Sequence, residues 1–247
     1  MVEPLRLPGK PAWLEINVQR AHLAQTFYTS FFGWRTKPMH HKPLGMMPLF
    51  DNGRGEFANG FMAMGAFAPP QWVCHVSGNP DEVAERVAQH GGKVLAEPHD
   101  NPGWGRITTF DDPEGTRLNV ILRDDGDLAD PSKPGDAHTL ELWATDAQAM
   151  GAFYAESLGL DITSTERGQT LAHGGTPRLF VRTCPFHPPP ARWIPYFRTA
   201  SLGADRRRAQ LFGAIPQVEP EELPGLGQVE LFADPAGAVF GLLELAD

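Results

Sequence analysis

Short apolar runs alternate with amphipathic segments along the chain, and this alternation predicts a mixed α+β protein. Between the amphipathic segments lie strand-like runs bounded by Gly and Pro turns, such as Asp112-Pro-Glu-Gly115. The helical segments each stop at a glycine, which ends a helix at little cost because it adopts left-handed backbone. The repeating unit is therefore one strand, one helix and three strands. Helical spacing of apolar residues occurs in residues 21–32, 80–90, 147–158 and 201–212.

The two halves of the chain are duplicates of each other. Leu14, Glu15 and Tyr28 recur at one constant offset as Leu140, Glu141 and Tyr154. A stretch rich in Asp, Pro and Gly separates the halves and has the composition of a linker. We therefore predict domains at 1–125 and 137–247, joined by a linker at 126–136. A helix after only the first strand of each unit excludes an eight-fold β/α barrel, which needs one after every strand.

Composition narrows the function classes. The chain has 21 Lys and Arg and 30 Asp and Glu, which gives a formal net charge of −9. This charge argues against sequence-independent binding to nucleic acid. No run approaches the length of a membrane span, and residues 1–10 lack the apolar stretch of a secretion signal, so we expect a cytoplasmic protein that does not bind membranes. Cys74 and Cys184 lie in separate strands and are expected to be reduced, buried thiols.

At this point the sequence resembles the vicinal oxygen chelate superfamily, which includes glyoxalase I, bleomycin resistance proteins and extradiol dioxygenases. The resemblance covers nearly the whole chain. It implies four βαβββ modules, paired into two curved, partly closed mixed β-sheets with the helices outside, and one cavity for each pair. The residues that carry it are Trp13-x-Glu15-x-Asn-Val, Phe27-Tyr28-x-x-Phe31-Phe32-Gly33-Trp34, Trp72-x-x-His75, Gly91-Gly92, Gly105-Arg106 and Asp112-Pro113-x-Gly115.

Strand alternation places three polar residues of the first half on one sheet face. Residues of a strand alternate between two faces, so Glu15, His75 and Asn119 project away from the aliphatic neighbours that the helices cover. The resemblance implies that these positions carry metal ligands in the family. Glu and His suit a divalent metal, whereas Asn is a poor substitute for a carboxylate, and the remaining position near Gly60 supplies no ligand. We therefore expect no cofactor; if a metal is bound, Glu15, His75 and Asn119 would hold it.

The second half is less suited to a metal, because Tyr196 matches His75 and Gly241 matches Asn119. Instead, the predicted ligand-binding residues here line a mixed aromatic and polar pocket. An alternative is that Trp143 and Tyr196 simply fill the sheet interior, with the Tyr196 hydroxyl bonded to Glu141. The predicted lining residues are Glu141, Trp143, Tyr196 and Arg198.

A carboxylate enclosed by a sheet must be protonated or have a partner, because burying an unpaired charge costs free energy. We therefore expect Glu15 and Glu141 each to have either a raised pKa or a definite partner, with His75 and Tyr196 as the candidates. A carboxyl held near neutrality could act as a general base, and a buried glutamate satisfied by its neighbours is the alternative.

Three functional hypotheses remain open from the sequence. The first is a glyoxalase-like protein that binds a small organic molecule in a sheet-enclosed cavity without the full metal site. The second is a metal-dependent lyase, isomerase or dioxygenase in which Glu15 and His75 are catalytic. The third is a non-catalytic module that sequesters a ligand or drug, as a bleomycin resistance protein does. The expected partner is a small molecule, and the protein itself is a monomer or a homodimer.

Overall fold

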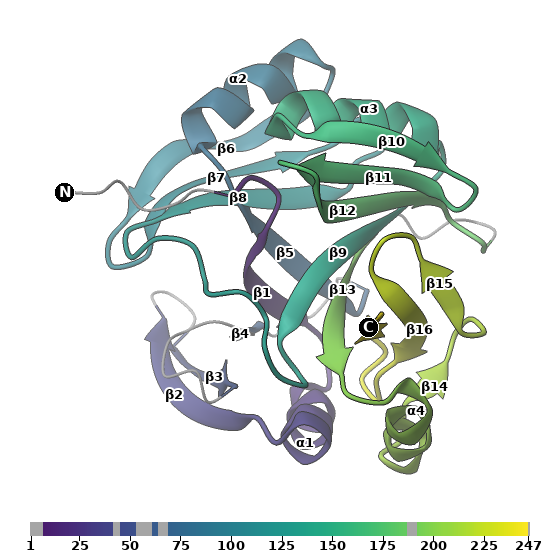
Figure 1. Cartoon of the computed structure of the whole chain (residues 1–247). Coiled ribbons are helices and arrows are strands. Elements are labelled where there is room, and N and C mark those ends of the chain that lie inside the picture. The colour runs from purple at the N-terminus through teal and green to yellow at the C-terminus, as the bar shows by residue number, and fades with distance from the viewer. Residues whose placement is uncertain (1–6, 42–44, 53–60, 64–68, 187–191, 247) are drawn as a thin grey trace. The chain divides into compact units, whose positions relative to one another are not determined.

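The structure of the protein is a computed structural model that describes residues 7–41, 45–52, 61–63, 69–186 and 192–246. Its first half contains two repeats of strand, helix and three strands (Figure 1). The elements of this half are β1 (Pro11–Asn17), α1 (Ala21–Phe32), β2 (Arg35–His41), β3 (Gly45–Asp51), β4 (Phe61–Ala63), β5 (Gln71–Ser77), α2 (Pro80–Gln89), β6 (Lys93–Asn101), β7 (Gly105–Asp111) and β8 (Arg117–Arg123).

The second half repeats the same order, with one additional short strand. Its elements are β9 (Ala137–Ala144), α3 (Ala147–Leu158), β10 (Asp161–Thr165), β11 (Gly168–His173), β12 (Thr176–Thr183), β13 (Arg192–Thr199), α4 (Leu202–Leu211), β14 (Ile215–Pro216), β15 (Glu221–Leu223), β16 (Gly227–Ala233) and β17 (Val239–Leu245).

The strands form two mixed sheets, as the sequence predicted. The strand order is β2-β3-β4-β1-β5-β8-β7-β6 in the first and β10-β11-β12-β9-β13-β17-β16-β14 in the second, where β15 also pairs with β16. Within each module the first strand runs parallel to the last one, and the remaining neighbours are antiparallel. The predicted α+β class and the four βαβββ modules are confirmed.

The contacts of the chain divide it into two compact units that combine modules from both halves of the sequence. Unit 1 consists of Met1–Ala12, Cys74–Ala129 and Thr139–Ile194, and so holds the second and third modules. Unit 2 consists of Trp13–Val73, Asp130–His138 and Pro195–Asp247, and holds the first and fourth modules. The domain boundaries expected from the sequence stay a prediction.

Unit 1 is held together by contacts between the turn after β7 and the helix α3. The Tyr154 hydroxyl donates to Asp112 Oδ2 at 2.9 Å, inside the protein. The carboxylate of Glu114 accepts hydrogen bonds from the backbone N–H groups of Thr145 and Asp146, at 2.6 and 2.7 Å, where α3 begins. Because a carboxylate at a helix start also opposes the helix dipole, the Asp-Pro-x-Gly turn has a direct structural role.

Unit 2 repeats the first of these contacts with the equivalent residues. Tyr28 of α1 donates to Asp234 Oδ2 at 3.0 Å, and its ring lies among Trp34, Trp72 and Phe240 at centroid distances of 5.3, 5.4 and 5.7 Å. Aromatic burial of this kind dominates core energetics. The Tyr-to-Asp bond therefore recurs as a framework element in both units.

The helix boundaries follow the local sequence signals. Asn79, Asp146 and Ser201 cap α2, α3 and α4 by accepting hydrogen bonds from backbone N–H groups of the first turn. Gly33 and Gly159, with φ of 72° and 68°, end α1 and α3. Both cysteines are free and buried, as predicted. Burial raises the pKa of the Cys74 thiol, so this residue behaves as an apolar side chain.

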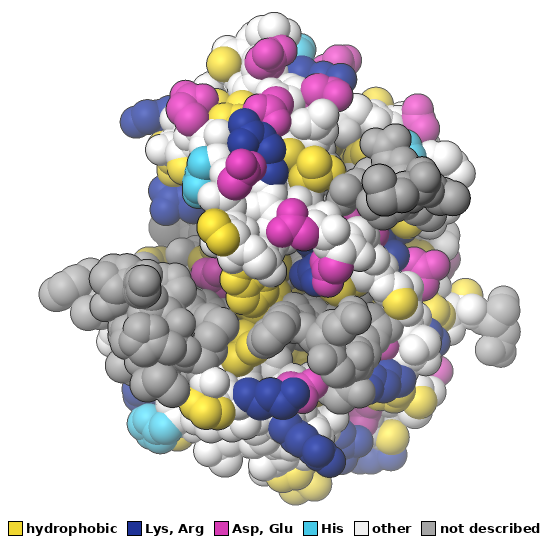
Figure 2. All heavy atoms as spheres, turned by 90° about the vertical axis from the view of Figure 1, so that its left-hand side faces the viewer, with side chains coloured by type: hydrophobic (Ala, Val, Ile, Leu, Met, Phe, Trp, Pro, Cys, Tyr) yellow, Lys and Arg dark blue, Asp and Glu magenta, His cyan; other side chains and the backbone are white. Residues whose placement is uncertain are grey.

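The surface carries both signs of charge. Acidic and basic side chains occur across the face shown in Figure 2, with apolar side chains between them. Among the described helices, none has the length and apolar character that crossing a membrane requires.

Candidate functional site

The predicted site residues lie at one recurring position, where the first and last strands of a module run side by side. The parallel register pairs Glu15 with Phe61 in the first module and His75 with Asn119 in the second. It pairs Glu141 with Phe180 in the third module and Tyr196 with Gly241 in the fourth. The four modules therefore present one equivalent pair of positions each, and these pairs can be compared directly.

The pair in the second module joins His75 and Asn119 within unit 1. Both side chains are buried. The Oδ1 atom of Asn119 accepts a hydrogen bond from the Thr109 hydroxyl at 2.6 Å, and its Nδ2 donates to the Cys74 carbonyl at 3.3 Å. These bonds fix the amide orientation and engage the one atom of Asn119 that could bind a metal ion.

The third module holds a buried ionic cluster centred on Glu141, also within unit 1. The Glu141 side chain is 0% exposed. Arg167 Nη2 lies 2.7 Å from its Oε2, and Arg182 Nε lies 3.1 Å from its Oε1. The Trp143 indole N–H donates to Oε1 at 2.9 Å. The predicted need for a definite partner is met here by two arginines and a tryptophan.

This cluster occupies the sheet face opposite α3. A side chain at Gly151 of α3 would collide with Gln169, and the register aligns Gln169 with Val181 and Val181 with Leu142. Since alternate residues face opposite sides, Glu141 and Trp143 lie on the far face, together with Phe180 and Arg182. Arg182 also lies over the Trp143 ring, 5.5 Å from its centroid, and Phe186 lies 5.3 Å from the same ring.

In the fourth module, within unit 2, an aromatic ring covers the second position of the pair. A Cβ atom placed on Gly241 would lie 2.2 Å from Cδ1 of Tyr196. The tyrosine ring therefore occupies the space that a side chain at 241 would need. That the second half is less suited to a metal stays a prediction.

Glu15 lies in unit 2 and differs from its counterpart Glu141. Its Oε1 accepts a hydrogen bond from the Trp13 indole at 3.3 Å, and burial raises the pKa of its carboxyl more than this bond lowers it. The prediction that Glu15 has either a raised pKa or a definite partner is met by the raised pKa.

Arg198, predicted to line the ligand pocket, lies in unit 2 and contacts the segment before β9. Its Nη1 donates to the Pro131 carbonyl at 2.8 Å, and its backbone pairs with Gly135 and Asp136. These contacts give Arg198 a structural role in holding residues 130–138.

At two of the four pairs, neighbouring residues engage a side chain that could bind a metal ion, and the expectation of no cofactor stays a prediction. Of the side chains that commonly bind such ions, Glu141 is engaged by two arginines, and Asn119 is engaged by Thr109. Asn59 and Gly60, near the position predicted to lack a ligand, lie outside the described residues. Within the part of the chain that is described, no three His, Cys, Asp or Glu side chains come together as a metal site would require.

Arg167 and Arg182 are not among the residues predicted from the sequence, although the sequence carries a signal for Arg182. Arg182 follows the apolar run Leu179-Phe-Val181 in a predicted strand. A charged residue on a buried strand requires a partner, and Glu141 on the neighbouring strand required one too. Arg167 lies in the turn between β10 and β11, and only the folded chain shows that it reaches Glu141.

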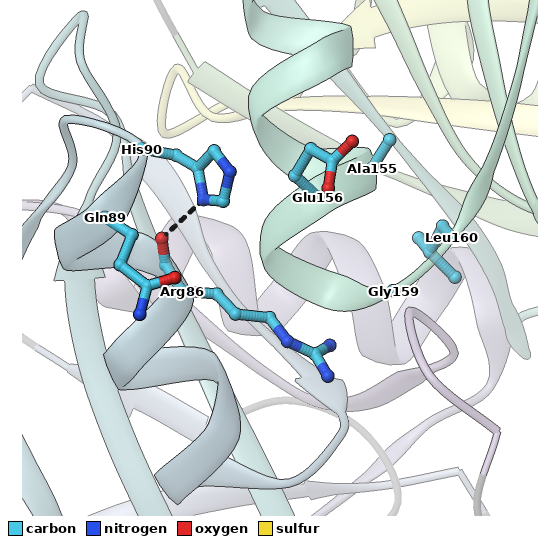
Figure 3. A pocket seen from close by; sticks show the side chains of 7 residues that line it. All are labelled: Arg86, Gln89, His90, Ala155, Glu156, Gly159 and Leu160. Carbon is cyan, nitrogen blue, oxygen red and sulfur yellow. Dashed lines mark hydrogen bonds between the residues drawn. The ribbon is translucent and has the colours of Figure 1, made fainter.

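Unit 1 also has a groove on its helical side, between the C-terminal ends of α2 and α3 (Figure 3). Its volume is about 480 Å³. His90 Nδ1 lies 2.7 Å from the Arg86 carbonyl, and the Arg86 side chain extends toward Gly159. The groove is polar and lies apart from the strand positions described above. Its lining residues are Arg86, Gln89, His90, Ala155, Glu156, Gly159 and Leu160.

Comparison with protein families and curated proteins places both halves in one group. Residues 10–120 match the family Glyoxalase/Bleomycin resistance protein/Dioxygenase superfamily, and residues 139–243 match the family Glyoxalase-like domain. The chain is 28% identical to "Putative glyoxylase CFP32" of Mycobacterium tuberculosis, over 96% of this chain and 95% of that protein. It is 27% identical to "Anthracycline biosynthesis protein DnrV" of Streptomyces peucetius, over 97% and 94%.

Solved structures show the same fold at lower identity. The Mn(II)-bound glyoxalase from Novosphingobium aromaticivorans aligns with a TM-score of 0.73 at 16% identity, over 97% of this chain and 83% of that one. The 2,3-dioxygenase LapB from Pseudomonas sp. KL28 aligns with a TM-score of 0.69 at 12% identity, over 98% and 94%.

Proposed function

Because the chain belongs to the vicinal oxygen chelate superfamily, we propose that it binds a small organic molecule on a sheet face, without the full metal site of that superfamily. The fold alone does not select this function, since one fold serves many chemistries. The proposal is carried by the cluster of Glu141, Arg167 and Arg182 in unit 1. The Glu141 carboxylate lies where the first strand of its module pairs with the last one, as at the equivalent positions of the other modules. Two guanidinium groups bind this carboxylate.

The chemistry of this cluster supports a planar ligand with an anionic oxygen. Its three charged side chains carry one negative and two positive charges, and the Arg182 guanidinium lies over the Trp143 ring. Guanidinium and indole groups both offer flat surfaces for stacking, and guanidinium binds carboxylates in a fork. The relative named for anthracycline biosynthesis points to planar aromatic compounds as the first to test.

The test uses 1-naphthoate as the probe and its neutral carboxamide as the matched ligand. We expect 1-naphthoate to raise the melting temperature and to bind by calorimetry, and the carboxamide to bind at least tenfold more weakly. Arg182→Gln should weaken naphthoate binding at least tenfold, whereas Arg106→Gln, at an exposed ion pair with Asp81, should leave it unchanged. If Arg182→Gln does not fold, Trp143→Phe serves instead and should weaken binding severalfold. Equal affinity for both ligands would contradict the proposal.

The metal-dependent alternative is a lyase, isomerase or dioxygenase that uses Glu15 and His75. The observations that favour it are the raised pKa of Glu15 and the register of His75 with Asn119. Metal analysis of protein purified without chelator separates the two functions. One tightly held divalent ion per chain, lost in both Glu15→Gln and His75→Ala, would favour the alternative.

A third function, sequestration of a drug-like compound without turnover, shares the proposed binding face. It predicts a melting shift with stoichiometric binding and no product. The cytoplasmic location and the lack of nucleic-acid and membrane partners are expectations from the sequence that accompany all three functions.

A further inference from the structure

One corner of unit 2 exposes three large apolar side chains within five residues. Leu211 is 85% exposed, Phe212 42% and Ile215 63%. They lie where α4 ends and β14 begins. Single exposed apolar residues are ordinary on a protein surface, but a group of them marks an interaction site or an aggregation risk.

The equivalent corner of unit 1, at the end of α2, can be compared directly with the α4 corner because its backbone makes the same hydrogen bonds. Phe212 N donates to the Arg208 carbonyl and Ala214 N to the Ala209 carbonyl. His90 N and Gly92 N make the same two bonds with Arg86 and Val87. A glycine with positive φ follows each helix, Gly91 at 84° and Gly213 at 91°. The two corners therefore have the same local fold.

At the positions of Leu211, Phe212 and Ile215, the α2 corner carries Gln89, His90 and Lys93, and all three are exposed. Figure 3 shows two of them, Gln89 and His90, beside the polar groove. The fold of this corner therefore does not require apolar side chains, and solvent exposure alone favours polar ones. The apolar residues of the α4 corner need another explanation, which a contact with a second molecule supplies.

The edge of the sheet indicates how that contact is made. Strand β14 ends its sheet, but it has only two residues, and its Pro216 has no N–H to donate. A partner therefore cannot extend the sheet there by regular pairing. Such a partner would pack instead against the exposed side chains of Leu211, Phe212 and Ile215.

The rim of this corner fits a second copy of the chain better than a partner of one charge. Arg207 on α4 is exposed, and Arg206 Nη2 of the same helix lies 3.7 Å from Oε2 of the exposed Glu219, which follows β14 by three residues. A two-fold contact brings the same patch together twice, so a patch with both charges can be complementary to itself. A standard interface buries roughly 800 Å² per partner, so three apolar side chains would supply its core and the polar residues around them the remainder.

We propose that two copies of this protein pair through the α4–β14 corner, with Leu211, Phe212 and Ile215 as the apolar core. The pairing is independent of the proposed ligand. It assigns a different role to unit 2, whose corner docks, than to unit 1, whose equivalent corner stays in solvent.

Sedimentation velocity of the full chain, from about 1 to 100 μM, tests this pairing. We expect the wild type to approach twice the chain mass of 27.1 kDa as the concentration rises. The triple variant Leu211→Gln, Phe212→His, Ile215→Lys, which transfers the residues of the α2 corner, should stay at the monomer mass. A matched control, Leu95→Gln with Ile162→Gln, removes two other exposed apolar side chains and should pair like the wild type.

A single substitution tests the same contact if the triple variant does not fold. Leu211 is almost fully exposed, so Leu211→Arg should leave the circular dichroism spectrum unchanged and weaken pairing at least tenfold. A wild type that stays monomeric over the whole range, including one that binds another hydrophobic molecule at this corner, would overturn the proposal. A triple variant that is folded and pairs normally would overturn it as well.

Discussion

Unit 1 and unit 2 share their framework contacts and differ at the sheet positions where a ligand would bind. In both, a helix tyrosine donates to the aspartate of a strand turn, Tyr154 to Asp112 and Tyr28 to Asp234. An arginine also approaches the end of the neighbouring helix in each unit. Arg208 donates to the Phe31 carbonyl, and Arg86 extends toward Gly159. Each of these contacts joins a helix to a neighbouring element of its own unit.

The sheet positions differ between the two units in what surrounds each candidate residue. Glu15 and Glu141 are equivalent in sequence, and each accepts a hydrogen bond from a nearby tryptophan. Glu141 is neutralised by two arginines, whereas Glu15 has a raised pKa caused by burial. The same residue type at one strand position thus has different partners in the two units, two arginines at Glu141 and the Trp13 indole at Glu15.

The largest effect is expected from neutralising Glu141. Glu141→Gln leaves Arg167 and Arg182 buried without the carboxylate, and breaking a buried ion pair from one side costs about 3–5 kcal/mol of unfolding free energy. Urea denaturation at pH 7 measures the loss.

Glu15→Gln is the matched control for this change. The raised pKa means that Glu15 contributes stability fully below its ordinary value of 4.5, and that this is lost as the pH rises through the folded pKa. At pH 7 its substitution should therefore leave stability unchanged or slightly higher. Equal destabilisation by both variants would show that the two glutamates do not differ as described.

The shared Tyr-to-Asp bonds should differ in their pH dependence. Burial raises the pKa of Asp234 from 3.8 to about 6, despite bonds from the Ala238 backbone and Tyr28 that lower it. Because the folded state favours the protonated carboxyl, Asp234 contributes fully to the free energy of unfolding below pH 4. This contribution, about 3 kcal/mol, is lost as the pH rises through about 6.

Asp234→Asn should remove this dependence, because the amide does not ionise. Melting temperatures from pH 4 to 7 measure it. Asp112→Asn is the comparison in unit 1: burial raises the Asp112 pKa too, but less, so its variant should flatten the profile less. A wild-type profile with no slope in this range would contradict the burial of Asp234.

The smallest effect is expected at the aromatic pair of unit 2. Gly241→Ala places a Cβ 2.2 Å from the Tyr196 ring, and overpacking of this kind costs about 1–3 kcal/mol. Gly203→Ala in α4 has nothing within 4 Å and should be neutral or slightly stabilising. Thermal unfolding compares them, and an unchanged melting temperature for Gly241→Ala would mean that the ring does not cover this position.

Much of the fold was predictable from the sequence because its signals are local. Helix spacing, the caps Asn79 and Asp146, and the stop at Gly33 act within a few residues. Strand alternation likewise predicted which residues share a face, and the register confirms that His75 lies opposite Asn119 and that Tyr196 lies opposite Gly241. The duplication predicted the modular order.

Only the tertiary structure decided what surrounds each candidate residue. The sequence by itself determined the four modules and the position of each glutamate on its strand, because periodicity and caps are short-range properties. It did not reveal that Arg167, 26 residues after Glu141, reaches that carboxylate, or that Tyr196 covers Gly241. Such contacts depend on how separate strands and turns pack, and packing sets both the burial of a charge and the partner that compensates it.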